Sequence, residues 1–238
     1  MTESIYLSVI VPAYNESKRI AKTVKEIDDY LKSQKYSYEI VVVDDGSKDN
    51  TFDVVSGLKL PHVRPIKQAK NTGKGGAVKT GMLSAVGEYR LMCDADNATP
   101  ISEITKLLAF ANEFPVVIGS RYMKGSNIRI KQPLTRIIGS RLFNTLVQLL
   151  LLPGFPDTQC GFKLFRANVV DKLFGKLETN RWGFDLEILV RARKSFLYIK
   201  QVPVEWCDQE GSSVNGVSVF ISAVKELINI KKQSKKWK

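Results

Sequence analysis

Short apolar runs and amphipathic stretches alternate along the first half of the chain. LSVIVPA at residues 7–13 and EIVVVDD at residues 39–45 are β-branched apolar runs, the pattern of strands that are buried on both faces. Between them, apolar residues recur at the spacing of one helix face: Ile20, Val24, Ile27 and Leu31. These segments predict a βαβ unit with a helix over residues 17–33.

The same alternation continues toward the middle of the chain. Further strands are predicted at residues 62–66, 88–93 and 115–121, and helices at residues 75–86 and 101–114. Strands that alternate with helices indicate an α/β fold, in which a mostly parallel twisted sheet is flanked by helices. The chain has 238 residues, is 44% hydrophobic and shows no linker, so we expect a single domain over residues 1–238.

Polar residues follow four of the predicted strands. They are Tyr14-Asn15-Glu16, Asp44-Asp45-Gly46-Ser47, Asp94-Ala95-Asp96 and Gly119-Ser120-Arg121. Because ligands of parallel sheets bind at the carboxyl ends of the strands, these groups predict one polar site along one sheet edge. Asp94 and Asp96 point to the same side and would repel each other, so we expect a positive charge between them. The alternative is a turn in which both acids cap a helix that begins near Ile101.

Composition excludes several kinds of chemistry. Three cysteines without metal-ligand spacing argue against a disulfide framework or a zinc site and favour a reducing compartment, and one histidine, His62, argues against a histidine triad. The net charge of +12 indicates an anionic partner. The N-terminus predicts a first strand and not a signal peptide. No stretch reaches the roughly 18 apolar residues of a spanning helix.

The glycine-rich stretch NTGKGGAVKTG at residues 71–81 differs from a nucleotide-binding loop. A Walker A motif that ends at Gly73-Lys74 needs glycine at 68 and serine or threonine at 75, but the chain has Gln68 and Gly75. Two interpretations stay open: a glycine turn that only begins a helix, or glycine amides and Lys74 that meet a diphosphate.

Ordered motifs carry a family resemblance. SVIVPAYNES, VVVDDGSKDNT, NTGKGGAVKTGM and CDADNAT, in this order and spacing, resemble the family 2 glycosyltransferases, which have the Rossmann-like GT-A fold, use nucleotide-diphosphate sugars and invert the anomeric centre. DTQCGFKLFR, RWGFDLEIL and VPVEW followed by EGSS are similar to the dolichyl-phosphate β-glucosyltransferases. One departure is Ser213, where those members tend to have lysine.

The resemblance implies an enzyme that moves one sugar, glucose from UDP-glucose, onto dolichyl or polyprenyl phosphate. A related transferase that uses GDP-mannose or UDP-N-acetylglucosamine is one alternative. An inactive, basic nucleic-acid-binding protein is an alternative of another class, but the basic runs lack the interleaved aromatic residues of a stacking platform. We therefore expect no nucleic-acid partner.

Paired carboxylates after a strand suit a hard divalent cation, Mg²⁺ or Mn²⁺, which stabilises a leaving diphosphate. The resemblance implies Asp96 as the direct metal ligand and Asp94 as a contact to metal or ribose. It also implies a nucleotide-sugar site formed by Pro12, Ala13, Tyr14, Glu16, Asp44, Asp45, Lys74, Asp94 and Ala95. For Asp45, an Asx-type turn is the structural alternative.

The acceptor determines which further groups are needed. A phosphate monoester is mainly ionised at neutral pH because its second pKa is near 6, so it requires a cationic clamp and no general base. Chemistry and resemblance favour Arg121, Arg136 and Ser140, with Arg141 in reserve. Asp185 matches a catalytic base of some relatives and Asp157 is a further candidate; for a phosphate acceptor, a positional role for Asp185 is favoured. In the segments around them we expect Trp182 and Phe184 to be packed and Lys163 to be on the surface.

Two amphipathic segments are candidates for membrane contact. Residues 134–152 carry an apolar stripe of Leu142, Phe143, Leu146, Leu149 and Leu150, and residues 217–238 combine an apolar helix face with the basic tail KKQSKKWK. The alternative is that both stripes pack on the domain or on a second subunit, as in a homodimer. We expect a cytoplasmic protein that is attached peripherally to the cytoplasmic face of a membrane.

Overall fold

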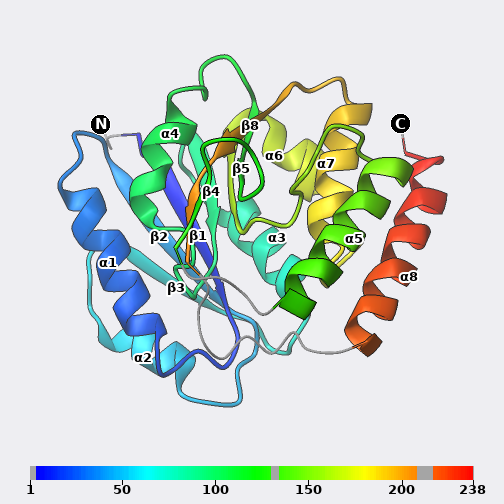
Figure 1. Cartoon of the computed structure of the whole chain (residues 1–238). Coiled ribbons are helices and arrows are strands. Elements are labelled where there is room, and N and C mark those ends of the chain that lie inside the picture. The colour runs from blue at the N-terminus through cyan, green and yellow to red at the C-terminus, as the bar shows by residue number, and fades with distance from the viewer. Residues whose placement is uncertain (1–3, 130–133, 208–216, 238) are drawn as a thin grey trace.

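The computed structural model describes residues 4–129, 134–207 and 217–237. Within these ranges, seven strands form a central sheet in the order β3-β2-β1-β4-β7-β5-β8 (Figure 1). Their bounds are β1 (Leu7–Ala13), β2 (Tyr38–Asp44), β3 (Val63–Lys67), β4 (Tyr89–Cys93), β5 (Val116–Ser120), β7 (Phe162–Arg166) and β8 (Ile199–Pro203). Neighbouring strands are parallel except at β7, which is antiparallel to β4 and β5. The predicted mostly parallel sheet is confirmed.

Helices cover both faces of the sheet, as Figure 1 shows. The helices are α1 (Ile20–Lys32), α2 (Thr51–Gly57), α3 (Lys74–Ser84), α4 (Ile104–Leu108), α5 (Leu134–Leu150), α6 (Ala167–Phe174), α7 (Phe184–Lys194) and α8 (Val217–Ser234), and a 3₁₀ turn, η1 (Ile101–Glu103), precedes α4. Alternate residues of β1 enter two separate cores: Ile10 packs with α3 and α5 to α8, whereas Val9 and Val11 pack with α1 and α4. Burial on both faces explains the continuous apolar runs.

The helix predicted over residues 17–33 is present as α1, and its four apolar positions are fully buried. The helix predicted over residues 101–114 is shorter than expected, because α4 ends at Leu108. The guanidinium of Arg166 accounts for part of this difference. It donates hydrogen bonds to the carbonyl oxygens of Ala111 (2.6 Å) and Asn112 (2.8 Å), which turns the chain toward β5.

One face of the C-terminal helix α8 packs against the core. It lies beside α5 (Figure 1), the rings of Phe143 and Phe220 are 6.5 Å apart, and Leu227 and Ile230 are buried. Packing on the domain therefore accounts for one face of this helix, while Ile221 and Ile228 on another face are about half exposed.

The stripe predicted for α5 divides between two faces. Phe143 is buried and Leu146 and Leu150 pack against the core, whereas Leu142 and Leu149 are exposed. Within the described ranges, no helix has the length and apolar character that crossing a bilayer requires.

Candidate active site

The carboxyl ends of β1, β2 and β4 meet at one edge of the sheet. Ala13 pairs with Asp44 in the parallel register, and the Asp45 amide donates to the Ala13 carbonyl at 2.8 Å. β4 lies on the other side of β1 and ends at Cys93, directly before Asp94 and Asp96. The acids that the sequence predicted at a common edge are therefore brought together by three adjacent strands.

Asp45 holds the glycine-rich turn. Its buried carboxylate accepts hydrogen bonds from the Thr72 amide (2.8 Å), the Thr72 hydroxyl (2.9 Å) and the Gly73 amide (2.8 Å). Gly73 has a φ of +94°, a conformation that side chains rarely adopt. Both oxygens of Asp45 are thus engaged with a distant segment and not in the local Asx-type turn that was the structural alternative, so Asp45 holds the glycine-rich turn in place.

The glycine amides of α3 are used within the protein. The amides of Gly75 and Gly76 donate to the Asn180 carbonyl at 2.8 and 3.3 Å, and a Cβ at Gly75 would lie only 2.7 Å from the Phe184 Cβ. Glycine at 75 therefore permits close approach of the segment before α7. Of the two interpretations of this stretch, the structure favours a packed turn, and Lys74 is the residue of the turn that faces the two acids.

Lys74 supplies a positive charge beside the acids. Its Nζ lies 2.6 Å from Oδ1 of Asp94 as an ion pair. Burial lowers the pKa of Lys74, but Asp94, Asp185 and Asp96 outweigh this effect and raise it. Burial, and then the charge of Asp94, raise the pKa of Asp96. The predicted repulsion between the acids is thus present, and Lys74 relieves part of it.

The start of α1 adds a second cation. Arg19 forms an ion pair with Glu16, in which Nη2 donates to Oε1 at 2.7 Å, and its pKa is raised by the hydrogen bond to Glu16 and further by Glu16 and Asp96 charges, against burial. The Thr23 hydroxyl donates to the Ala95 carbonyl at 2.7 Å and fixes the turn between the two acids. Neither Arg19 nor Thr23 was predicted from the sequence, although Arg19 directly precedes α1 and Thr23 lies on it.

The two acids fit a divalent cation that is shared with a diphosphate. Within the described ranges, no group of three or more histidine, cysteine and acidic side chains converges. Mg²⁺ is often held by one or two carboxylates together with substrate phosphates and water, so Asp94 and Asp96 are sufficient. Oδ1 of Asp94 is paired with Lys74, and a Cβ at Gly161 would overlap this carboxylate. Glycine at position 161 therefore leaves the space that the Asp94 carboxylate occupies.

The remaining predicted nucleotide contacts lie along the same edge. Pro12, Ala13 and Ala95 are buried, Tyr14 is 39% exposed, and Glu16 is half-buried beside Arg19. Asp44 is buried; its Oδ1 accepts from the Ser47 amide at 3.3 Å, while Oδ2 has no hydrogen-bond partner among the described residues. The free oxygen of Asp44 and the exposed ring of Tyr14 are available to a ligand.

Arg121, predicted to bind the acceptor phosphate, is instead paired with Asp157. Its Nε and Nη2 donate to the two carboxylate oxygens at 2.8 and 2.9 Å, and its backbone amide adds a third bond of 2.8 Å. Burial alone would raise the pKa of Asp157, but Arg121 outweighs burial and holds it below its usual value. The structure therefore favours a role for Arg121 in positioning the loop after β5.

Two predicted acceptor residues surround Tyr122. The Arg141 guanidinium lies 4.0 Å from the centre of the Tyr122 ring, and the Ser140 hydroxyl is 3.1 Å from the Tyr122 hydroxyl. Arg141 is exposed. The side chain of Arg136 lies outside the described residues, as does Ser213. Tyr122 was not among the predicted site residues.

Asp185, in the first turn of α7, forms a buried ion pair with Lys163 on β7, with 2.6 Å between Nζ and Oδ1. Burial raises the pKa of Asp185, against the charges of Lys163 and Lys74. The expectation that Lys163 is on the surface was wrong, because this counter-ion draws it into the interior. Phe184 is buried as expected, but Trp182 is 47% exposed and its ring lies 5.6 Å from Lys74 Nζ.

Comparison with known proteins gives consistent matches. The glycosyl transferase family 2 profile matches residues 8–174. A dolichyl-phosphate beta-glucosyltransferase of Dictyostelium discoideum is 39% identical, and the match covers 96% of this chain and 75% of that protein. Proteins of the same name from Saccharomyces cerevisiae and Homo sapiens are each 36% identical, with 96% and 94% of this chain covered and 75% and 74% of theirs.

A solved structure has the same fold. Glucosyl-3-phosphoglycerate synthase from Mycobacterium tuberculosis, in complex with Mn²⁺, UDP-glucose and phosphoglyceric acid, superposes with a TM-score of 0.74. The superposition covers 96% of this chain and 80% of that one, at 16% sequence identity. The predicted GT-A fold is confirmed.

The ion pair between Arg121 and the buried Asp157 makes a prediction about stability. Arg121→Ala should lower the free energy of unfolding by about 3–5 kcal/mol, because it leaves the buried Asp157 charge without its paired cation. The control is Arg129→Ala, since Arg129 pairs with Glu205 while 64% exposed, and such pairs contribute about 0–1 kcal/mol. Urea unfolding measures both variants. Equal losses would mean that Arg121 is not committed to Asp157.

Proposed function

The chain belongs to glycosyl transferase family 2, and we propose that it transfers one glucose from UDP-glucose to dolichyl or polyprenyl phosphate, with inversion at the anomeric carbon. The observation that carries this proposal is the sheet edge at which Asp94, Asp96 and Lys74 converge. Relatives over about 95% of the chain are named dolichyl-phosphate beta-glucosyltransferases, and a neighbour of the same fold binds Mn²⁺ and UDP-glucose.

On the donor side, we assign each side chain to the part of the sugar nucleotide that its chemistry suits. The unpartnered Oδ2 of Asp44 can accept a hydrogen bond from a ribose hydroxyl or a base N–H, and the exposed ring of Tyr14 can cover the base. Asp94 and Asp96 would hold Mg²⁺ or Mn²⁺, which supplies positive charge to the leaving diphosphate. Lys74 lies beside Asp94 and adds a cation to the same place, so it would contact the diphosphate as well.

On the acceptor side, an ionised phosphate oxygen attacks the anomeric carbon from the face opposite to the departing UDP, which inverts the centre. No proton has to be removed from this nucleophile, in agreement with Asp185 being held by Lys163 and so not free to act as a base. The clamp for the phosphate is assigned to Arg141 and Ser140, with Arg136 beside them in the sequence. Arg121 acts through Asp157 and positions this side of the site.

Membrane contact is assigned to the exposed face of α5. Ile138, Leu142 and Leu149 are 65%, 52% and 76% exposed, and they recur at helical spacing beside Arg141. A lipid whose phosphate is bound at Arg141 would leave its chain next to these side chains. We place the enzyme at the cytoplasmic face of the membrane, where sugar nucleotides are available. A homodimer stays a prediction.

The proposed reaction is tested by the release of nucleoside diphosphate from a donor panel. We expect UDP release from UDP-glucose that depends on both Mn²⁺ and a short polyprenyl phosphate, and little from UDP-N-acetylglucosamine or GDP-mannose. Asp96→Asn should lower turnover on the order of 100-fold or more at an unchanged melting temperature, because it removes a charged metal ligand.

Several outcomes of this assay, of an RNA-binding measurement or of the melting-temperature control would contradict parts of the proposal. Preference for GDP-mannose or UDP-N-acetylglucosamine would replace the sugar and keep the reaction class. Salt-sensitive RNA retention without any sugar-nucleotide binding would favour the nucleic-acid-binding alternative. Near-normal turnover of Asp96→Asn would refute the metal assignment, and unfolding of this variant would support the helix-capping interpretation of the two acids.

The acceptor clamp predicts separate effects on the two substrates. Arg141→Ala should raise the KM for polyprenyl phosphate about tenfold and leave the KM for UDP-glucose unchanged, because a hydrogen bond to a charged group contributes about 1.5–3 kcal/mol. Arg141→Lys should rescue only part of the loss, since lysine lacks the planar fork. Arg193→Ala, an exposed arginine in the last turn of α7, is the control. Equal increases in both KM values would argue against an acceptor role.

The α5 face predicts how the protein binds membranes. Changing Ile138, Leu142 and Leu149 to Ser should weaken binding to phosphatidylglycerol vesicles at least tenfold, since each buried apolar side chain contributes about 1.5–3 kcal/mol. Transfer to a long-chain acceptor should slow, while a short soluble acceptor reacts as before. The control changes Val86 and Phe196 to Ser, because both are exposed and precede the amino ends of β4 and β8. Equal losses in both variants would reject α5 as the contact.

A further inference from the structure

The segment of residues 178–183, here called the bridging loop, leads into α7 and touches the glycine turn at the site. Its Asn180 carbonyl accepts the amides of Gly75 and Gly76, at 2.8 and 3.3 Å. Its Trp182 ring lies 5.6 Å from Nζ of Lys74. The bridging loop therefore holds the first turn of α3 and covers the ammonium of Lys74.

The opposite side of the bridging loop is held by α8. Oε2 of Glu226 accepts a hydrogen bond from the Gly183 amide at 2.7 Å. Gly183 is the N-cap of α7, so a carboxylate from another helix satisfies one of the free amides at that terminus and complements its dipole. The same first turn carries Asp185. One side chain of α8 thus fixes both the end of the bridging loop and the start of α7.

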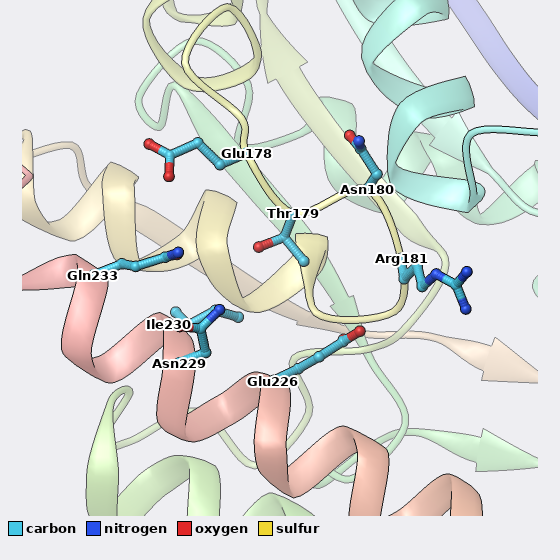
Figure 2. Close-up of a pocket in the computed structure, with 8 residues that line it drawn as sticks. All are labelled: Glu178, Thr179, Asn180, Arg181, Glu226, Asn229, Ile230 and Gln233. Carbon is cyan, nitrogen blue, oxygen red and sulfur yellow. The ribbon is translucent and has the colours of Figure 1, made fainter.

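A pocket lies beside the hydrogen bond between Glu226 and Gly183. It has a volume of ≈300 Å³ and lies between the bridging loop and α8. Figure 2 shows Thr179 and Arg181 on the loop and Glu226, Asn229 and Gln233 on the helix, with Glu226 pointing toward the loop. Apart from Ile230, whose Cδ1 would lie 3.0 Å from a Cβ at Gly183, the residues that line this pocket are polar. The Glu187 carboxylate of α7 holds the start of the loop by accepting the amides of Glu178 (2.9 Å) and Thr179 (2.8 Å). Loss of the Glu226 contact would therefore release the Gly183 end of the loop, which borders the open volume.

We propose that Glu226 is a positioning residue of the donor site. It fixes the bridging loop through Gly183, and the loop in turn fixes Lys74 through Asn180 and Trp182. This inference rests on the proposed role of Lys74 at the diphosphate. Residue 226 lies outside residues 8–174, which the family profile matches, whereas Lys74, Asp94 and Asp96 lie within them, so the C-terminal helix contributes to a site whose donor-side groups belong to the matched region.

The test combines four variants of the full chain. Glu226→Ala removes the acceptor, and Glu226→Gln keeps an oxygen that can accept the Gly183 N–H. Asn229→Ala is the matched control, because Asn229 lines the same pocket one turn along α8 without a hydrogen bond to the described part of the loop. Ile104→Val removes one methyl from the core on the other face of the sheet, and it controls for a general loss of stability.

Titration calorimetry with UDP and Mn²⁺ and steady-state kinetics measure the effect. Glu226→Ala should weaken UDP binding and raise the KM for UDP-glucose, each about three- to tenfold, without changing the KM for the acceptor. Glu226→Gln should recover most of this loss. Asn229→Ala and Ile104→Val should bind UDP like the wild type. The inference is overturned if Glu226→Ala binds UDP as tightly as the wild type. It is also overturned if Ile104→Val has the same melting temperature as Glu226→Ala and loses as much affinity for UDP.

Hydrogen–deuterium exchange separates this inference from the proposed function. Without any ligand, the peptide that contains Gly75 and Gly76 should exchange faster in Glu226→Ala than in the wild type, because its carbonyl partner Asn180 is released. Unchanged exchange would overturn the positioning role. If the wild-type protein binds no nucleoside diphosphate, the proposed function fails, while faster exchange in Glu226→Ala would still support the mechanical link from α8 to the glycine turn.

Discussion

Two carboxylates at the end of a buried strand impose the constraint that shapes this site. Asp94 and Asp96 directly follow β4, and burial, together with the charge of Asp94, raises the pKa of Asp96. Lys74 partly neutralises these two acids, because the glycine turn places its ammonium beside Asp94. That turn depends on Asp45, which accepts three hydrogen bonds from it, and on the bridging loop, which accepts two more. The position of one ammonium thus requires three separate segments of the chain.

Cations in this protein have two distinct surroundings. Lys163 is buried and the Arg121 side chain is only 16% exposed, and each is paired with one buried carboxylate, Asp185 or Asp157. Arg141 is exposed and stacks on the ring of Tyr122. A buried cation with its own counter-ion orients its neighbours and has little charge left for a substrate, whereas an exposed cation on an aromatic ring can still bind a phosphate. For this reason we propose Arg141, and not Arg121, as the residue that binds the acceptor phosphate.

Local pattern predicted much of the fold and part of the site. The periodicity of α1 and the apolar runs of β1 and β2 identified the sheet, and parallel strands then placed Asp44, Asp94 and Asp96 on one edge. Partners that are distant in the sequence could not be found in this way. Arg121 and Asp157 are 36 residues apart, and Lys163 and Asp185 are 22 apart. Periodicity in the sequence does not show which basic residue pairs with which acid. For this reason Lys163 was expected on the surface, and Arg121 was expected to bind the acceptor phosphate.

We propose that Asp94 and Asp96 would hold a divalent cation beside the diphosphate of the donor. Electron–nuclear double resonance on the protein with Mn²⁺ and UDP tests this proposal, because it detects phosphorus nuclei bound close to the metal. We expect ³¹P coupling from UDP in the wild-type protein and its loss in Asp96→Asn. UDP that binds equally well without Mn²⁺, together with no ³¹P coupling in the wild type, would contradict the claim.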